Sequence, residues 1–272
     1  MRFFLKLSYR GASFCGWQRQ PNAPSVQQTL EEGLHTILRS QIPIVGAGRT
    51  DTGVNARCMY AHFDIPPGVH VPDDAKGFED WKRRLLTGLD RLCGRDIAMH
   101  GLIPVGDDAH ARFDAVRRTY KYFVTPAKSA FLHPLSWYCP SCLDMDGMNQ
   151  AASLLMSTSD FTSFAKLHSD ARTNICHVYE ARWESRVSEI TGEEMLVFTI
   201  SADRFLRNMV RAIVGTLVEV GRGKMTVDGF KRVIEARDRC AAGSSMPPQA
   251  LTLWDVGYPY LPAYDNLHLK NM

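Results

Sequence analysis

The sequence lacks any long hydrophobic run. Nowhere do about eighteen apolar residues follow one another, the length that a helix needs to cross a bilayer, so we expect no membrane span. The first residues, MRFFLKLSYR, return to charge after five positions and show no signal-peptide cleavage site. These absences argue against a membrane protein and favour a cytoplasmic one.

The sequence also lacks a strong excess of charge of one sign. It has 32 Lys and Arg against 29 Asp and Glu, a net charge of +3, which excludes a polycation that binds nucleic acid by charge alone. Basic residues nevertheless gather in two stretches, 112–121 and 204–211. Such patches suit the phosphates of a structured RNA. On charge alone, an ordinary solvated face is the simpler interpretation of both.

Regularly spaced cysteines are missing as well. The seven cysteines are odd in number and irregularly placed, which favours reduced thiols in a cytoplasm over a disulfide framework. Cys139 and Cys142 resemble half of a zinc site, with Cys176 and His177 as conceivable partners. A strong zinc signal has two such pairs, so we expect unliganded thiols and no metal.

Hydrophobic periodicity predicts two sets of strands, each accompanied by two helices. We expect strands at 2–9, 42–45, 57–63, 119–124, 180–187, 195–201 and 251–258, and helices at 26–38, 73–93, 148–156, 204–220 and 226–237. This order predicts an α/β (α+β) chain of two similar halves around a mainly antiparallel mixed sheet flanked by helices. We place the halves at 1–106 and 107–262, followed by a tail at 263–272.

A glycine-rich loop between two predicted strands carries the first candidate for chemistry, Asp51. The loop sequence is GRTDTG, residues 48–53, and its glycines permit a sharp turn that presents one side chain. An ordinary turn aspartate is the better interpretation of Asp51 taken alone. Arg49 and two hydroxyl residues in the same loop favour a functional role.

The helix predicted at 204–220 offers a partner for that carboxylate. Arg211 falls beside the helix's apolar stripe, so we expect its guanidinium to be at least half buried. A buried guanidinium needs a carboxylate or carbonyl groups, unless it extends to solvent. We therefore hypothesise that Arg211 binds Asp51 through a bidentate contact and holds it in its charged form.

Four segments carry a resemblance to a known family: FCGWQRQPNAPSVQQTLE (14–31), GRTDTGVNA (48–56), RRTYKYFV (117–124) and FLRNMVRAIVGTLVEVG (205–221). Together they resemble the tRNA pseudouridine synthase A family in the right order over nearly the whole chain. The sequence departs from the common pattern at Thr52, usually alanine, and Asn55, usually histidine.

The resemblance implies the pseudouridine synthase fold and the isomerisation of uridine to pseudouridine at positions 38–40 of the tRNA anticodon stem-loop. It implies Asp51 as the nucleophile, no cofactor, no metal, and a homodimer that binds tRNA. It also assigns Tyr120 to the active site, whereas strand alternation alone does not choose between Tyr120 and Tyr122. The residues that the resemblance or loop composition assigns to RNA contact are Trp17, Gln18, Arg19, Arg49, His110, Arg112, Phe113, His168 and Arg172.

Two other functions compete with this interpretation. The tripeptide Asp51-Thr52-Gly53 also occurs in aspartic proteases, but these need a second carboxylate and a shared proton, which Arg49 so close to the aspartate disfavours. An RNA-binding protein without catalysis would need the basic loops but not Asp51. Loss of activity without loss of binding in an Asp51 variant distinguishes the enzyme from that alternative.

Overall fold

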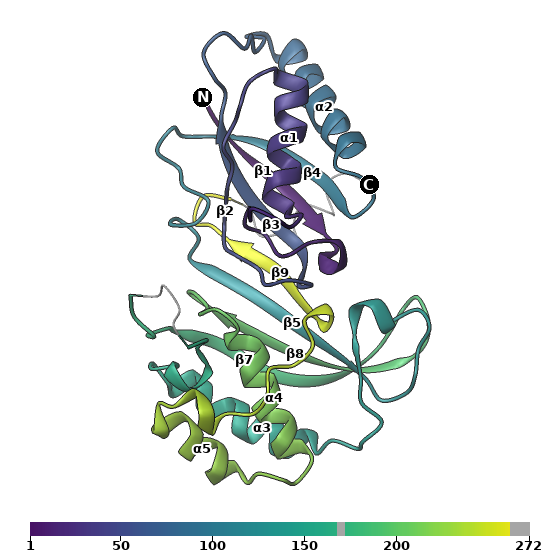
Figure 1. Ribbon diagram of the computed structural model, residues 1–272, viewed down its shortest axis with the longest axis vertical. Helices are drawn as coiled ribbons and strands as arrows, with labels where there is room; N and C mark the ends of the chain where they lie inside the picture. The colour runs from purple at the N-terminus through teal and green to yellow at the C-terminus, as the bar shows by residue number, and fades with distance from the viewer. Residues whose placement is uncertain (168–171, 262–272) are drawn as a thin grey trace. The chain divides into compact units, whose positions relative to one another are not determined.

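The computed structural model describes residues 1–167 and 172–261, which form two compact units (Figure 1). The first unit comprises residues 1–116 together with the chain from 255, and the second comprises residues 117–254. The division predicted from the sequence lies at 106/107 instead. The predicted tail at 263–272 lies outside the described residues.

The first unit consists of antiparallel strands with two helices. Its elements are β1 (Arg2–Tyr9), α1 (Val26–Leu38), β2 (Val45–Gly46), β3 (Asn55–Asp64), α2 (Ala75–Leu92) and β4 (Ile97–Val105). Strand β1 lies between β3 and β4 and is antiparallel to both, and the short β2 pairs with β3. Figure 1 shows α1 and α2 together on one face of these strands.

The core of the first unit covers both faces of β1. On one face Phe3 contacts Trp81 of α2, with ring centroids 5.7 Å apart. On the other face Phe4 contacts Tyr258, with ring centroids 5.2 Å apart. The strand predicted at 2–9 is therefore confirmed, but even Lys6 is only 5% exposed, because the second face is also covered.

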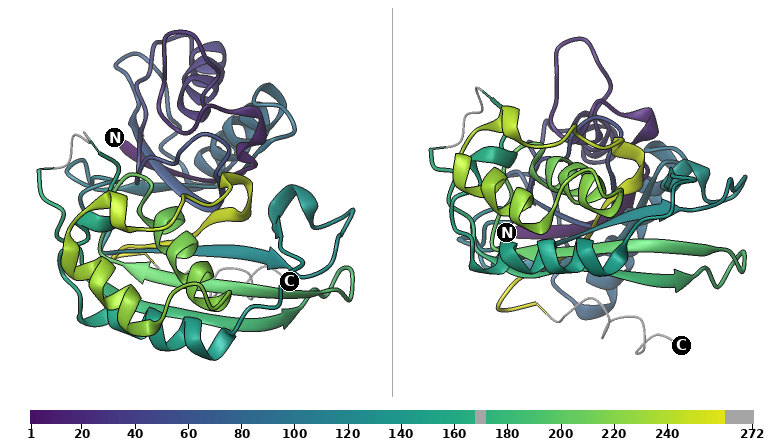
Figure 2. Two further views of the ribbon diagram at one scale, coloured as in Figure 1. Left: turned by 60° about the horizontal axis from the view of Figure 1, so that its bottom comes forward. Right: turned by 90° about the horizontal axis from the view of Figure 1, so that it is seen from below.

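The second unit is built on the same plan of antiparallel strands and helices. Its elements are β5 (Arg117–Thr125), β6 (Trp137–Tyr138), α3 (Met145–Ser153), β7 (Val178–Val187), β8 (Glu194–Ala202), α4 (Met209–Gly221) and α5 (Val227–Ala236). Strand β8 pairs antiparallel with β5 and β7, and β6 runs parallel to β5. Helices α3, α4 and α5 pack against one another (Figure 2). The last strand, β9 (Leu251–Gly257), contains the division between the units.

Local signals placed several elements correctly. The Ser25 side chain accepts a hydrogen bond from the Gln28 amide and so caps α1, which begins at Val26 as predicted. Gly192 has a φ of +69° in the turn between β7 and β8, as expected at a hairpin. The start of α4 was predicted wrongly: Asn208 is left-handed, with a φ of +66°, so the helix begins at Met209 and not at 204.

The fold class is confirmed: mostly antiparallel strands are flanked by helices in both units. Among residues 1–167 and 172–261, no helix has the length and apolar character that a bilayer crossing requires.

Candidate active site

Asp51 lies in an irregular loop of the first unit that joins β2 to β3, here called the Asp51 loop (residues 47–54). A turn follows Asp51, in which the Val54 amide donates to the Asp51 carbonyl at 3.1 Å. Gly53 has a φ of +79° in this turn, a conformation that residues with a side chain rarely adopt. The Asp51 side chain is half-buried, so a substrate can reach a carboxylate whose backbone is fixed.

The Asp51 loop is held by hydrogen bonds on both sides of the carboxylate. Before it, the Thr50 hydroxyl bonds to the Tyr9 hydroxyl at 2.8 Å, and the Thr50 carbonyl accepts from the Trp17 amide at 3.2 Å. After it, the Gly53 amide donates to the Phe14 carbonyl at 3.4 Å. Strand β1 and the loop after it thus fix the position of the aspartate.

Two glycines of that preceding loop permit its close approach. Gly16 has a φ of +88°, and a side chain there would overlap the Thr50 carbonyl oxygen. A side chain at Gly11 would overlap the carbonyl of Val54. The Gly11 amide donates to the Asn55 side chain at 2.8 Å, so Asn55, which departs from the family pattern, is a structural residue here.

Trp17 is buried and does not present its ring for stacking on a base. It is 3% exposed, and its indole fills the space that a side chain on Gly46 would occupy. Its neighbours Gln18 and Arg19 are exposed, and Arg19 forms an ion pair with Glu31 at 3.3 Å. The geometry therefore gives Trp17 a role in supporting the Asp51 loop, and we do not retain it as an RNA contact.

Burial separates the two tyrosines of β5 in the second unit. Tyr122 is fully buried and its hydroxyl donates to the Pro247 carbonyl at 3.1 Å. Burial raises the pKa of Tyr122 well above its usual range, so this hydroxyl stays protonated. Tyr120 is half-buried, with its ring edge-on to Phe205 at 5.1 Å between centroids. Of the two rings, Tyr120 is the one that a substrate can meet.

Arg211 lies in the first turn of α4 and is half-buried, as its place beside the apolar stripe predicts. Its Nε donates to the Met246 carbonyl at 2.6 Å, and the Met246 amide donates to the Arg211 carbonyl at 3.1 Å. Gly215, one turn later, admits the Ser244 backbone where a side chain would overlap it. The chain at 243–247 therefore fixes the base of the arginine side chain.

The remaining predicted RNA contacts lie on loops. Arg49 and Arg172 are exposed, and His168 lies outside the described residues. Arg112 and Phe113 are exposed in a segment of the first unit that follows β4, whereas His110 is half-buried beneath them. These side chains are placed where a large polar ligand can reach them.

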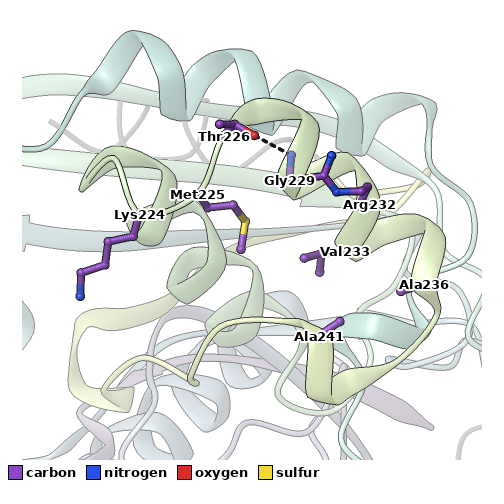
Figure 3. Close-up of a pocket in the computed structure, with 8 residues that line it drawn as sticks. All are labelled: Lys224, Met225, Thr226, Gly229, Arg232, Val233, Ala236 and Ala241. Atoms are coloured by element: carbon purple, nitrogen blue, oxygen red, sulfur yellow. Dashed lines mark hydrogen bonds between the residues drawn. The ribbon is translucent and has the colours of Figure 1, made fainter.

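A pocket lies at the start of α5 in the second unit (Figure 3). It is lined by Lys224, Met225, Thr226, Gly229, Arg232, Val233, Ala236 and Ala241. The Thr226 hydroxyl accepts from the Gly229 amide at 3.0 Å, which caps the helix. None of the predicted site residues lines this pocket, so it adds nothing to the candidate site.

The described residues offer no set of three or more His, Cys, Asp or Glu side chains that could hold a metal ion. The cysteines of the conceivable zinc pair, Cys139 and Cys142, are free thiols, as is Cys176. Burial raises the pKa of Cys176 to about 12, so this thiol stays protonated near pH 7.

Comparison with known proteins identifies the relatives of this chain. A family model described as tRNA pseudouridine synthase matches residues 151–259. The tRNA pseudouridine synthase A of Parabacteroides distasonis is 52% identical over 260 residues, which cover 95% of this chain and 96% of that protein. The protein of the same name from Porphyromonas gingivalis is 50% identical over 258 residues, covering 95% and 97%. This chain therefore belongs to the tRNA pseudouridine synthase A family.

Proposed function

We propose that this chain is an isomerase that converts uridine to pseudouridine in tRNA, with Asp51 as its nucleophile. The observation that carries the proposal is the identity of 52% over 95% of the chain to a tRNA pseudouridine synthase A. The Asp51 loop supports it, because Asp51 is a half-buried carboxylate on a backbone fixed at Thr50 and Gly53. The competing protease and binding-only functions receive no support from these relatives.

The reaction is an isomerisation. The glycosidic bond between N1 and C1′ breaks, the uracil turns, and C5 bonds to C1′. C5 then loses its proton, and N1 gains one. No electrons are gained or lost, so no redox cofactor is required. The chemistry needs a charged carboxylate near the sugar, which is the role proposed for Asp51. Attack at C1′, attack at C6 and removal of the 2′ proton are all compatible with an aspartate in this position.

Tyr120 and Arg211 complete the proposed catalytic set. The target uridine must leave its stack to be modified, at a cost of a few kcal/mol, and the half-buried ring of Tyr120 offsets part of it by stacking. Arg211 is proposed to bind the Asp51 carboxylate. Because its Nε already donates to the Met246 carbonyl, the bidentate contact would use the two terminal nitrogens of the guanidinium.

The finer parts of the proposal follow the family resemblance. The modified uridines are those at positions 38–40 of the anticodon stem-loop, and Arg49, Arg112 and Arg172 contact the RNA beside them. The active form is a homodimer in the cytoplasm, and a twofold dimer is the commonest assembly of soluble proteins. Mapping pseudouridines in tRNA from cells that lack this protein tests the positions, and light scattering of the purified protein tests the dimer.

Tritium release from tRNA labelled at uridine C5 tests the proposed reaction and its nucleophile. We expect Asp51→Asn to lower the rate at least about 10⁴-fold while tRNA binding stays within about threefold, because the amide keeps the shape and loses the charge. Asp73→Asn, at an exposed position of the same unit, is the matched control and should react at the parent rate. Equal tritium release by Asp51→Asn and the parent protein would overturn the proposal.

Arg211→Lys tests the proposed guanidinium. Lysine keeps the positive charge but cannot make a bidentate contact while also donating to the Met246 carbonyl. We expect the variant to remain folded by circular dichroism and to lose about 10²-fold in kcat. A parent-like kcat in a folded Arg211→Lys protein would contradict the role proposed for Arg211.

A further inference from the structure

The segment of the first unit that carries Arg112 and Phe113 is tightly bound to the sheet beneath it; we call residues 109–114 the 109–114 segment. The Ala109 carbonyl accepts from the Arg2 guanidinium at 2.9 Å, and the Ala111 carbonyl accepts from the Tyr258 hydroxyl at 2.5 Å. Ala111 is fully buried, whereas Phe113 is 75% exposed. The segment thus has an anchored base and an exposed tip.

Its tip is organised by two histidine rings. Three successive backbone amides each donate to the Nδ1 atom of an imidazole: Ala111 to His62 at 3.1 Å, Arg112 to His110 at 3.1 Å, and Phe113 to His110 at 3.2 Å. The two rings are edge-on, with centroids 4.6 Å apart, and the His110 ring lies 4.2 Å from that of Phe113. The His110 ring thus supports the exposed phenylalanine, and the His62 ring lies edge-on to His110.

These hydrogen bonds fix the protonation state of both rings. An Nδ1 atom that accepts from an amide must keep its lone pair, so the single ring proton of each histidine lies on Nε2. A doubly protonated imidazole would point a proton at each amide and lose all three bonds. His62 is only 6% exposed, so its amide partner at Ala111 has no water to replace the lost acceptor.

Some charged groups around the two rings favour a positive charge on His62, and others disfavour it. Arg2, which faces both rings, and His110 disfavour a positive charge on His62, whereas Asp64 and Asp114 favour one. Arg2 is paired with Asp64 at 2.8 Å, which offsets much of the effect of each. Burial decides the balance and lowers the pKa of His62 to about 4.

His110 faces a similar set of groups. Asp114 favours its charged form, Arg2 and Arg112 disfavour it, and burial lowers its pKa. The Asp114 carboxylate accepts from the His110 amide at 2.7 Å and from the Tyr260 hydroxyl at 2.8 Å, so it is already engaged in fixing the backbone. Both rings are therefore neutral near pH 7 and available as acceptors.

We propose that His62 is a positioning residue for tRNA binding: as a neutral acceptor beneath His110, it holds the turn at 111–113 so that Arg112 and Phe113 meet the RNA in a fixed arrangement. His62 lies in β3, outside all four segments that carry the family resemblance, and the proposed set of RNA contacts does not include it. The inference rests on the proposed function and adds to it the device that shapes one RNA-contacting segment.

Two substitutions at His62 separate its hydrogen bond from its bulk. His62→Phe keeps a ring without an acceptor, whereas His62→Asn places an amide oxygen close to the position of Nδ1. In tritium-release assays at pH 7.5 we expect His62→Phe to raise KM and the tRNA Kd about tenfold, with kcat within about twofold. His62→Asn should bring both constants back to within about threefold of the parent. His70→Asn, on an exposed loop of the same unit, is the control.

A double-mutant cycle tests whether His62 acts through the segment it supports. In an Arg112→Ala, Phe113→Ala background the exposed contacts are gone, so adding His62→Phe should raise KM less than about twofold further. A full further tenfold loss in that background would overturn the inference, because His62 would then act elsewhere. A parent-like KM for folded His62→Phe would overturn it as well.

A second variant, His110→Phe, serves if His62→Phe does not fold. His110 is half-buried, and His110→Phe removes the acceptor of the Arg112 and Phe113 amides, so it should raise KM as His62→Phe does. If His110→Phe binds tRNA like the parent, the inference fails. Failure of the proposed function has a different result: the parent protein itself then releases no tritium, while amide exchange at 111–113 in the His62 variants still reports whether the imidazoles hold the turn.

Discussion

The Asp51 loop and the 109–114 segment are two irregular stretches of the same unit that are held by different kinds of group. Peptide groups and hydroxyl groups fix the Asp51 loop, as in the bonds from Tyr9 and Trp17 to Thr50. Imidazoles organise the tip of the 109–114 segment. Only the second kind of group has an ordinary pKa between about 5 and 8.

This difference separates the chemistry from the binding. The backbone around the proposed nucleophile should keep its shape across that pH range, whereas the arrangement of Arg112 and Phe113 depends on two rings that must stay neutral. Substitutions in the Asp51 loop should therefore lower kcat, and substitutions in the 109–114 segment should raise KM.

The largest effect is expected at Gly16, where the first loop meets Thr50. Gly16→Ala forces a side chain into a left-handed backbone and against the Thr50 carbonyl, and we expect a loss of about 4 kcal/mol in the free energy of unfolding. The surviving folded protein should have a lower kcat, because the Asp51 loop must shift. Denaturant titration and tritium release measure the two effects.

Gly68→Ala is the matched control for this substitution. Gly68 has a similar φ of +91° but nothing within 4 Å of the added carbon, so only the backbone strain remains, about 1 kcal/mol. If Gly16→Ala and Gly68→Ala cost the same, the close approach to Thr50 does not hold the Asp51 loop.

A smaller, pH-dependent effect on the free energy of unfolding is expected at His62, which supports the 109–114 segment. The pKa of His62 is lowered from 6.5 to about 4 in the folded protein, so between these values the unfolded chain binds more protons than the folded one. The stabilisation is complete above pH 6.5 and is lost as the pH falls toward 4. We expect the advantage of the parent over His62→Asn in free energy of unfolding to shrink by about 2 kcal/mol from pH 7 to pH 5.

The measurement is a set of urea titrations of both proteins at half-unit pH intervals. Because the carboxylates titrate alike in both, their difference isolates His62. Because His62 in the folded protein stays neutral until the pH nears 4, the ratio of the parent KM to the His62→Asn KM should stay level over this interval. Parallel stability curves for the two proteins would show that His62 does not carry this pH dependence.

The sequence predicted the parts of the site that local signals encode. Glycines and hydroxyl residues around Asp51 make it a candidate, and the half-burial of Arg211 that the period of its helix predicts is confirmed. Tyr120 and Tyr122 were indistinguishable by alternation, and the structure separates them by burial alone. Which of two residues on one face is covered depends on the segment packed over it, here the chain at 247, which is remote in sequence.

The same limit explains what sequence reasoning missed. Trp17 in a polar loop favoured a stacking surface, but the space beside Gly46 in β2 buries its ring. His62 gave no signal, because one histidine in a strand does not reveal that an amide 49 residues later lies over it. The late start of α4 depends on the left-handed Asn208, whose side chain bonds to Ser245 at 2.5 Å. Each of these contacts joins positions that are too far apart in the sequence for hydrophobic periodicity to relate them.

The smallest expected effect compares one hydroxyl from each region. Tyr9→Phe removes the partner of the Thr50 hydroxyl, and Tyr258→Phe removes the donor to the Ala111 carbonyl. Each should cost about 1 kcal/mol in the free energy of unfolding, the usual value of one buried hydrogen bond. Their kinetic effects should differ, because Thr50 adjoins the nucleophile and Ala111 adjoins the RNA contacts: Tyr9→Phe lowers kcat at every pH, and Tyr258→Phe raises KM. If both variants change the same constant, the separation of chemistry from binding is wrong.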